Sequence, residues 1–268
     1  MGALSHTGSA MKIAVCVKQI PDPNTPYALD PETHFVQRPQ DQVLDDTDRY
    51  GVEVGLQLAE ATGGSVTLVS MCPAGSLQGI RQALAMGAAK AVIVNDPALR
   101  GSGALATAKV LAAVLRKEQP DLVSAGTEST DGYTGVVPQQ LAELLGLPSL
   151  TFARKVSQAD GKIRIERLTA TGYEVVEAPL PALLSVTSGA VEPRYPTFKG
   201  IMAAKSKPIE QPAAADLGLS PQEIGPAGSA QEIAGVRAAP ERGSGRKVVD
   251  EGEAYLEIVR LLEQVKVI

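Results

Sequence analysis

Short apolar runs alternate with helical periodicities along the first half of the chain. Residues 12–17 are apolar after the first position and rich in β-branched side chains, as in a strand that is buried on both faces. Residues 48–61 carry apolar side chains three or four positions apart, and a Gly-Gly pair ends this pattern. The same alternation predicts strands over residues 65–70, 91–94 and 121–125, and helices over residues 76–86, 102–117 and 134–145.

Strands that alternate with helices in this way favour an α/β fold. We expect a Rossmann-like parallel sheet with helices on both faces and right-handed crossovers. In such a sheet, ligands bind at the carboxyl ends of the strands, where the strand order reverses. The sequence therefore predicts a ligand crevice at this edge.

The pattern changes after Pro148. Residues 150–156, 162–168 and 173–178 read as strands, with a turn at residues 159–161, and they predict an antiparallel extension of the sheet. Residues 182–186 return to the apolar composition of a core strand.

The C-terminal part has a different composition. Residues 209–249 contain no aromatic residue and four prolines, so this segment should not fold alone. Residues 250–265 show one apolar helical stripe, and Asp250 and Glu253 have the spacing of a capping box. We expect an arm that ends in an amphipathic helix, whose stripe must pack on its own domain or on a partner.

Composition excludes several classes of function. The net charge is −5, aromatic residues make up 3% and Trp is absent, so a nucleic-acid-binding face is not expected. No apolar run approaches the roughly 20 residues that span a bilayer, so membrane insertion is not expected either. Two histidines exclude a multi-histidine metal site, and two cysteines form no disulfide framework, which favours a cytoplasmic protein that binds or transfers electrons. Residues 1–10 form a polar leader, not a secretory signal, and we expect the natural start at Met11.

The segment 191–208 combines stiffness, apolar side chains and positive charge. Two prolines flank a tyrosine, three apolar residues follow at helical spacing, and no acid interrupts the four bases, although the whole chain is acidic. A docking element fits this pattern, and so does a loop that caps the core with its phenylalanine buried. The residues concerned are Pro193, Arg194, Tyr195, Pro196, Phe198, Lys199, Ile201, Met202, Lys205 and Lys207.

Together with residues 180–182, this segment resembles the signature of the electron transfer flavoprotein β-subunit family, and the resemblance extends over residues 11–268. It implies an adenine-nucleotide-hydrolase-like domain over residues 11–208 and an arm over residues 209–268 that embraces an α subunit, with residues 216–219 at a short motif of such arms. It further implies FAD in the α subunit, AMP without a redox role in this chain, and no bond chemistry of its own. Electrons would come from acyl-CoA dehydrogenase-type flavoenzymes and pass to a quinone reductase or another acceptor.

The nucleotide would lie at the strand ends. The loop 126–137 is rich in small and hydroxyl residues and opens onto a helix N-terminus, which suits a phosphate but equally an ordinary cap and turn. It matches neither the Walker motif nor the dinucleotide fingerprint. Asp131 fits a turn better than a phosphate contact. The resemblance implies adenine against the backbone of Cys16 and Met71, with Val17 and Lys18 adjoining, the ribose or base beside Asp45, and phosphate on Thr134, Gly135, Val136 and Val137.

The resemblance also assigns docking roles. Glu174 would pair with an arginine of the flavin-bearing domain of the α subunit, although a solvated strand glutamate is the alternative. Phe198 would be the apolar anchor for a dehydrogenase, with Ile201 and Met202 beside it. Lys199, Lys205 and Lys207 would steer an acidic partner. Arg194 and Tyr195 fit a role in shaping the elbow.

Two other functions stay open at this point. A β subunit of the bifurcating type would hold a second FAD in this crevice, near residues 20–43, where Tyr27 and Phe35 are the available aromatics. A free-standing adenine-nucleotide sensor would need neither the arm nor an exposed anchor.

Overall fold

The computed structural model describes residues 10–237, 240 and 245–268, so the expected leader lies almost wholly outside the described residues. The chain divides into two compact units, with the first ending at Ile233 and the second spanning Ala234–Ile268.

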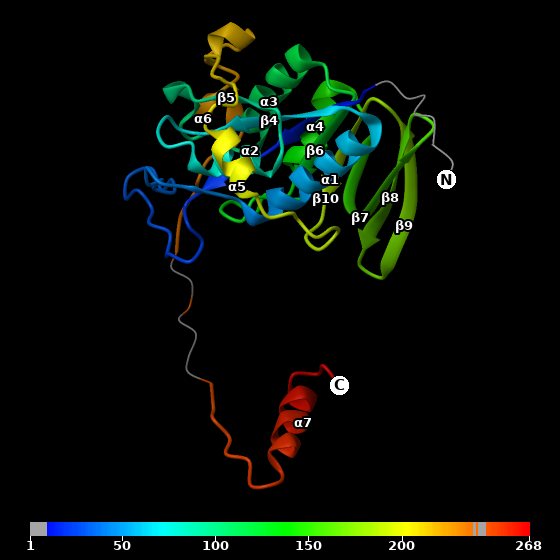
Figure 1. Ribbon diagram of the computed structural model, residues 1–268. Helices are drawn as coiled ribbons and strands as arrows, with labels where there is room; N and C mark the ends of the chain where they lie inside the picture. Colours follow the sequence, from blue (N-terminus) through cyan, green and yellow to red (C-terminus); the bar gives the residue numbers. More distant parts are fainter. Residues whose placement is uncertain (1–9, 238–239, 241–244) are drawn as a thin grey trace, which may run out of the picture. The chain divides into compact units, whose positions relative to one another are not determined.

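One mixed sheet organises the first unit (Figure 1). Its first seven strands, in spatial order, run parallel. Strand eight pairs antiparallel with strand seven, and strand nine pairs antiparallel with strand eight, which confirms the α/β fold and its antiparallel extension. The order is β11 (Ile209–Glu210), β5 (Lys90–Val94), β4 (Ser65–Met71), β1 (Lys12–Cys16), β6 (Leu122–Gly126), β10 (Ala182–Val186), β7 (Ser149–Ala159), β8 (Lys162–Thr169) and β9 (Gly172–Pro179).

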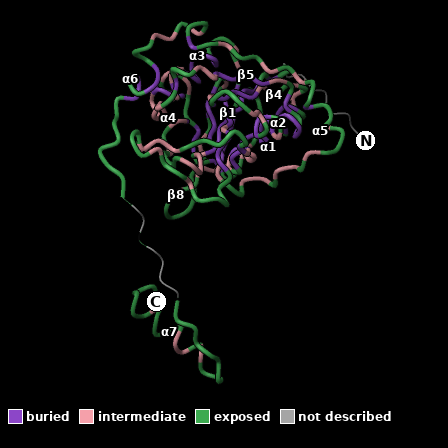
Figure 2. The backbone as a smooth tube through the Cα atoms, turned by 90° about the vertical axis from the view of Figure 1, so that its left-hand side faces the viewer, coloured by how far each residue is buried: buried purple, intermediate pink, exposed green. Residues whose placement is uncertain are grey.

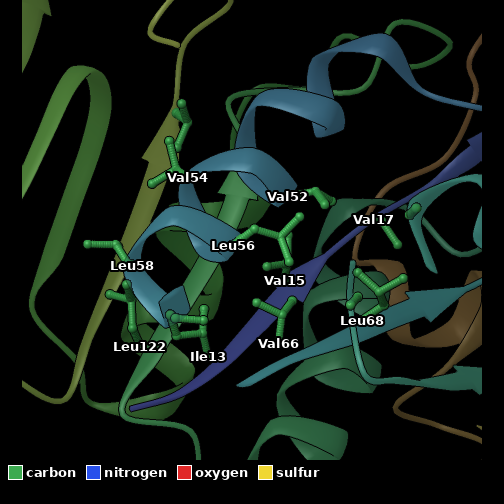
Figure 3. Packing of buried hydrophobic residues seen from close by; sticks show 14 of the residues in the cluster. Ile13, Val15, Val17, Val52, Val54, Leu56, Leu58, Val66, Leu68 and Leu122 are labelled. Carbon is green, nitrogen blue, oxygen red and sulfur yellow. The ribbon is translucent and has the colours of Figure 1, made fainter. Parts of the chain in front are cut away.

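Helices cover both faces of the parallel part. Helices α1 (Asp46–Thr62) and α2 (Gln78–Met86) pack on one face, and α3 (Ala104–Glu118) and α4 (Val137–Leu145) pack on the other. The pleat of β1 divides its side chains accordingly, because Ile13 and Val15 enter the first layer and Ala14 enters the second. Figure 2 shows the buried residues concentrated in the sheet and the inner helix faces, and Figure 3 shows α1 packed against β1.

The structure adds short elements that the periodicity does not predict. Strands β2 (Gln19–Ile20) and β3 (Val43–Leu44) pair at the two ends of a Pro-rich loop, residues 21–42. Helix α2 lies close to them because Gly79 has no side chain, and a Cβ there would lie 2.7 Å from the Cβ atom of Gln19. Two-residue strands carry no periodic signal, so only the tertiary packing reveals them. The other additions are β11, η1 (Pro97–Leu99), η2 (Ala215–Leu217) and α6 (Gly225–Ser229). Helix α5 (Phe198–Ala204) forms where the apolar residues of segment 191–208 recur at helical spacing.

The first compact unit continues beyond the boundary at residue 208 that the sequence suggests. Strand β11 adds a parallel edge to β5, and Ala214 and Ile224 are buried against the α3 layer. Leu217 and Leu219, from the expected arm motif, pack on the same layer. Residues 209–233 therefore fold onto a ready-made sheet, although their own composition could not support a core.

The second unit contains helix α7 (Ala254–Gln264). The predicted capping box is wrong, because Glu253 is itself the N-cap residue and makes no side-chain capping bond. Asp250 instead accepts hydrogen bonds from the backbone N–H groups of Gly252 and Ala254. The apolar stripe is present as expected. It consists of Tyr255, Ile258, Val259, Leu262 and Val265, all exposed except the half-buried Leu262. Among the helices described, none combines the length and apolar character that a bilayer crossing needs.

Candidate nucleotide crevice and docking segment

The strand order reverses between β1 and β6. From β1 the chain proceeds outward through β4 to β5, and it then returns to add β6 on the other side of β1. The carboxyl ends of β1, β4 and β6 therefore meet at the switch point, where parallel sheets of this kind bind ligands. The structure brings Cys16, Met71 and the loop after Gly126 to this edge, as predicted.

Asp45 lies at this switch point as the N-cap residue of α1. One carboxylate oxygen accepts hydrogen bonds from the backbone N–H and hydroxyl of Thr47, and the other accepts them from the same two groups of Thr130. The residue is fully buried. This carboxylate thus joins α1 to the loop after β6, and its contact with a ribose or base remains a prediction.

Asp48 is a buried acid that the sequence analysis does not single out. Its Oδ2 accepts the N–H of Lys18 at 2.6 Å, so it holds the end of β1. Gly126, at the end of β6, lies so close that a Cβ there would be 2.8 Å from Oδ1. Burial, reinforced by the negative charge of Asp45, raises the pKa of Asp48 well above its usual value, despite the N–H groups of Lys18 and Gly126. An acid in the first turn of a helix is an ordinary feature of helix starts. The sequence therefore carries no signal that Asp48 accepts from the N–H of Lys18.

Asp131 forms the centre of a three-residue ion-pair cluster. Its two oxygens accept hydrogen bonds from Lys18 Nζ and Arg38 Nη2, each at 2.6 Å, and its side chain is fully enclosed. Burial by itself would raise the pKa of Asp131, but the charges of Lys18 and Arg38 outweigh it and hold this pKa below its usual value. The cluster ties the Pro-rich loop to the loop after β6, and leaves one positive charge in excess beside the crevice.

The turn before α4 presents unpaired backbone donors. Helix α4 begins at Val137, three residues later than expected, and its N-cap Val136 has no side-chain capping bond. Within the described part of the chain, no hydrogen bond is made by the N–H groups of Gly135, Val136 or Val137. Gly135 has φ +63°, which few other residues adopt, and Thr134 is exposed. Main-chain N–H groups at a helix start are suited to an anion such as phosphate.

The thiols at this edge are not poised for redox chemistry. Burial, with a smaller effect of Asp48, raises the pKa of Cys16 to about 12, and burial raises that of Cys72 to about 11. Both cysteines are free, and they point into opposite helical layers. They serve as small apolar side chains.

Two open hollows lie at the opposite edge of the sheet. One, of about 270 Å³, is lined by residues at the amino ends of β1 and β4, and the other, of about 430 Å³, lies beside β11. Lys90, in the first hollow, is already paired with Glu118 and Glu210. Among these sites, unpaired donors and the strand-order reversal coincide only at the carboxyl edge.

The docking segment, residues 191–208, presents an apolar surface. Phe198 begins α5 and is 81% exposed, Tyr195 is 85% exposed, and Ile201 and Met202 are about half exposed. The alternative of a phenylalanine buried in the core is therefore wrong. Lys199 and Lys205 are exposed beside this surface.

Lys207 and Arg194 are committed to internal contacts. Lys207 Nζ donates to the carbonyls of Leu84 and Ala88 at the end of α2, and burial lowers its pKa, so it does not serve as a free surface charge as expected. Arg194 binds the carboxylates of Glu53 and Glu60 on α1, which agrees with a role in shaping the elbow. Glu174 lies exposed on β9, opposite Arg167 of β8.

Known sequences match this arrangement over nearly the whole chain. A sequence model of the electron transfer flavoprotein domain matches residues 33–217. The electron transfer flavoprotein subunit beta of Mycobacterium tuberculosis is 41% identical over 263 residues, which cover 96% of this chain and 99% of that protein. The chain belongs to the electron transfer flavoprotein β-subunit family. Membership gives it a role in electron transfer and implies an α-subunit partner.

More distant relatives show the breadth of the family. The electron transfer flavoprotein subunit beta of Megasphaera elsdenii is 35% identical over 254 residues, which cover 91% of this chain and 94% of that protein. The caffeyl-CoA reductase-Etf complex subunit CarD of Acetobacterium woodii is 34% identical over 241 residues, which cover 89% and 92%.

The Asp131 cluster makes a stability prediction. We expect Asp131→Asn to lower the free energy of unfolding by about 2 kcal/mol at neutral pH, because Lys18 and Arg38, both partly exposed, lose the enclosed carboxylate that accepts from them. Since the folded-state pKa lies below the ordinary 3.8, the stabilisation is present above that value and is lost as the pH falls through the folded-state pKa. Denaturant titrations at several pH values measure the difference between the two proteins, which should shrink at the acid end.

Asp46→Asn is the matched control, because Asp46 is 78% exposed in its pair with Arg49. Its effect should stay below about 1 kcal/mol. Equal effects of the two substitutions, or a difference for Asp131 that grows toward acid pH, would contradict the assignment.

Proposed function

We propose that this chain is the scaffold of a heterodimeric electron carrier of the cytoplasm. It binds AMP as a structural ligand, supports an α subunit that carries FAD, and docks acyl-CoA dehydrogenase-type donors. The heterodimer then delivers electrons to a quinone reductase or another acceptor. The observation that carries the docking role is a phenylalanine exposed on a short helix that is fixed to the domain, next to exposed lysines.

The AMP proposal is supported by the chemistry of the carboxyl edge. Phosphate would be bound by the N–H groups of Gly135, Val136 and Val137 and by the Thr134 hydroxyl, at the start of α4. The Lys18–Asp131–Arg38 cluster carries one positive charge in excess, which offsets the carboxylate of Glu128 beside Gly135. Adenine would lie against the backbone of Cys16 and Met71, with Val17 adjoining.

A second FAD in this crevice is the alternative ligand, and one observation favours keeping it. Tyr133, which the sequence analysis does not consider, is 67% exposed in the loop before α4 and could contact a flavin ring. Phe35 is unsuited to this role, because its ring lies against Gly101, where a Cβ would come within 2.7 Å of it.

The arm is proposed to contact the α subunit through α7. Tyr255, Ile258, Val259, Leu261 and Val265 are exposed on this helix within the second unit. An amphipathic helix with an uncovered stripe gains stability by burying it on a partner surface.

Docking through Phe198 is tested by Phe198→Ala in the co-expressed heterodimer. Removing the ring should weaken docking by about 1.5–3 kcal/mol, which raises the KM of a donor dehydrogenase for the carrier roughly 10- to 100-fold. FAD content should stay unchanged, because the side chain is exposed. Leu168→Ala, an exposed apolar residue of β8, is the control, and unchanged electron transfer in Phe198→Ala would exclude the anchor.

The identity of the nucleotide is tested by heat release from the purified heterodimer. We expect the supernatant to contain FAD and AMP in equal amounts by mass spectrometry and visible absorbance. Twice the FAD with no AMP would replace our proposal by the alternative. A β chain that purifies alone as a stable monomer with AMP would instead indicate a nucleotide sensor.

Glu174 is proposed to pair with an arginine of the flavin-bearing domain of the α subunit. Because Glu174 is exposed, the pair should contribute at most about 1 kcal/mol, which lets that domain detach. We expect Glu174→Gln to shift the small-angle scattering of the heterodimer toward other domain orientations. A profile identical to that of the unmodified heterodimer would argue that Glu174 is merely solvated.

A further inference from the structure

Arg194 fastens the docking segment to α1 through its backbone N–H and all three guanidinium nitrogens, which donate to Glu53 and Glu60. Its backbone N–H and Nε donate to Glu53 Oε2 at 3.1 and 2.8 Å, and Nη2 donates to Glu53 Oε1 at 3.0 Å. Nη1 and Nη2 also reach the two carboxylate oxygens of Glu60, two turns further along α1. Glu53 is only 4% exposed, so this pair is screened little by water.

The pKa of Glu53 agrees with a strong contact. Burial alone would raise it, but the hydrogen bonds from Arg194 and Gln57 outweigh burial and lower it below its usual value. Glu53 is therefore charged at neutral pH, and the guanidinium is its counter-ion.

Helices α2 and α5 also cap each other. Arg81, on α2, donates from Nη1 to the carbonyl of Ala204 at the end of α5, at 2.7 Å. Lys207, just after α5, donates to the carbonyls of Leu84 and Ala88 at the end of α2. A cation at a helix C-terminus satisfies orphan carbonyls and opposes the helix dipole.

Gly200 brings the two helices into direct contact. A Cβ at this position would lie 2.4 Å from the carbonyl oxygen of Ala85, so any side chain would push α5 away from α2. Helix α5 is thus held against α2 and, through the preceding Arg194, tied to α1, while Phe198, Ile201 and Met202 remain exposed.

We propose that Arg194 is a positioning residue for partner docking: with Glu53 and Glu60 it presents Phe198 in a fixed orientation before any partner arrives. The inference rests on the docking function proposed above. A seven-residue helix has little stability of its own, so its order must come from such contacts. Binding to a pre-ordered anchor avoids the entropic cost of ordering it during association.

The clamp, meaning the contacts of Arg194 with Glu53 and Glu60, is tested by hydrogen exchange of the heterodimer, which needs no donor. Arg194→Gln should speed exchange of the α5 amides at least about tenfold, because the free energy needed to open α5 locally becomes smaller. Lys199→Gln removes one positive charge from α5 itself, away from Glu53 and Glu60, and should leave this exchange rate unaltered. Glu60→Gln is the milder second variant, because it removes only the ion pair between Arg194 and Glu60 and leaves the one with Glu53.

The positioning role is tested by a double-mutant cycle on electron transfer from a donor dehydrogenase. Arg194→Gln should raise the KM for the carrier about three- to tenfold, with kcat retained. In a Phe198→Ala background the same substitution should have almost no effect, because there is no anchor left to position. Arg194→Lys keeps the charge but not the two-acid geometry, and should recover only part of the loss.

The outcomes separate the inference from the proposed function. Unchanged α5 exchange in Arg194→Gln and Glu60→Gln overturns the clamp. Faster exchange with additive kinetic effects overturns the positioning role, because Arg194 would then act independently of Phe198. If Phe198→Ala alone leaves transfer intact, the docking function fails, whatever the exchange experiment shows.

Discussion

The close packing of α1 on β1 and β6 is the contact on which both functional surfaces depend. Two glycines one turn apart, Gly51 and Gly55, allow it: a Cβ at Gly55 would lie 2.9 Å from a methyl group of Val15, and one at Gly51 would lie 3.3 Å from the backbone of Ala125. The N-cap and first turn of α1 contribute Asp45 and Asp48 to the crevice, and its middle contributes Glu53 to the docking segment. One helix, set against the central strand, therefore fixes the position of the nucleotide edge and of the docking segment together.

The charges at the crevice are arranged so that the main chain is left to bind an anion. Asp131 neutralises one of two cations, and Asp45 uses all its acceptors on backbone and hydroxyl groups. Burial raises the pKa of Asp48 and so reduces its negative charge near the site. The carboxylates of Asp45 and Glu128 also lie at this edge, so the N–H groups before α4, and not a net positive charge, suit it to an anion.

The sequence predicts those parts of the fold whose signal is local and repeated. Six of the seven parallel strands, all except β11, follow from periodicity, and so do the four helices packed on the sheet, because each buries a regular face. Helices α2, α3 and α4 begin two or three residues later than expected, since Ser and Thr precede a helix as readily as they begin it, whereas α1 begins two residues earlier. The packing of residues 209–233, the role of Asp48 and the capture of Lys207 depend on residues distant in sequence, so no local pattern could reveal them.

The two docking contacts proposed for this chain need opposite physical properties. A donor must remain attached while electrons move, so its contact calls for an apolar anchor whose burial does not depend on salt, and which is ordered in advance. The flavin-bearing domain must approach and depart, so its contact calls for an exposed ion pair, which is weak and screened. The structure provides this division: the anchor stands on a helix clamped by a nearly buried glutamate, whereas Glu174 lies exposed on an edge strand. A mobile carrier can thus be held firmly at one surface and loosely at the other.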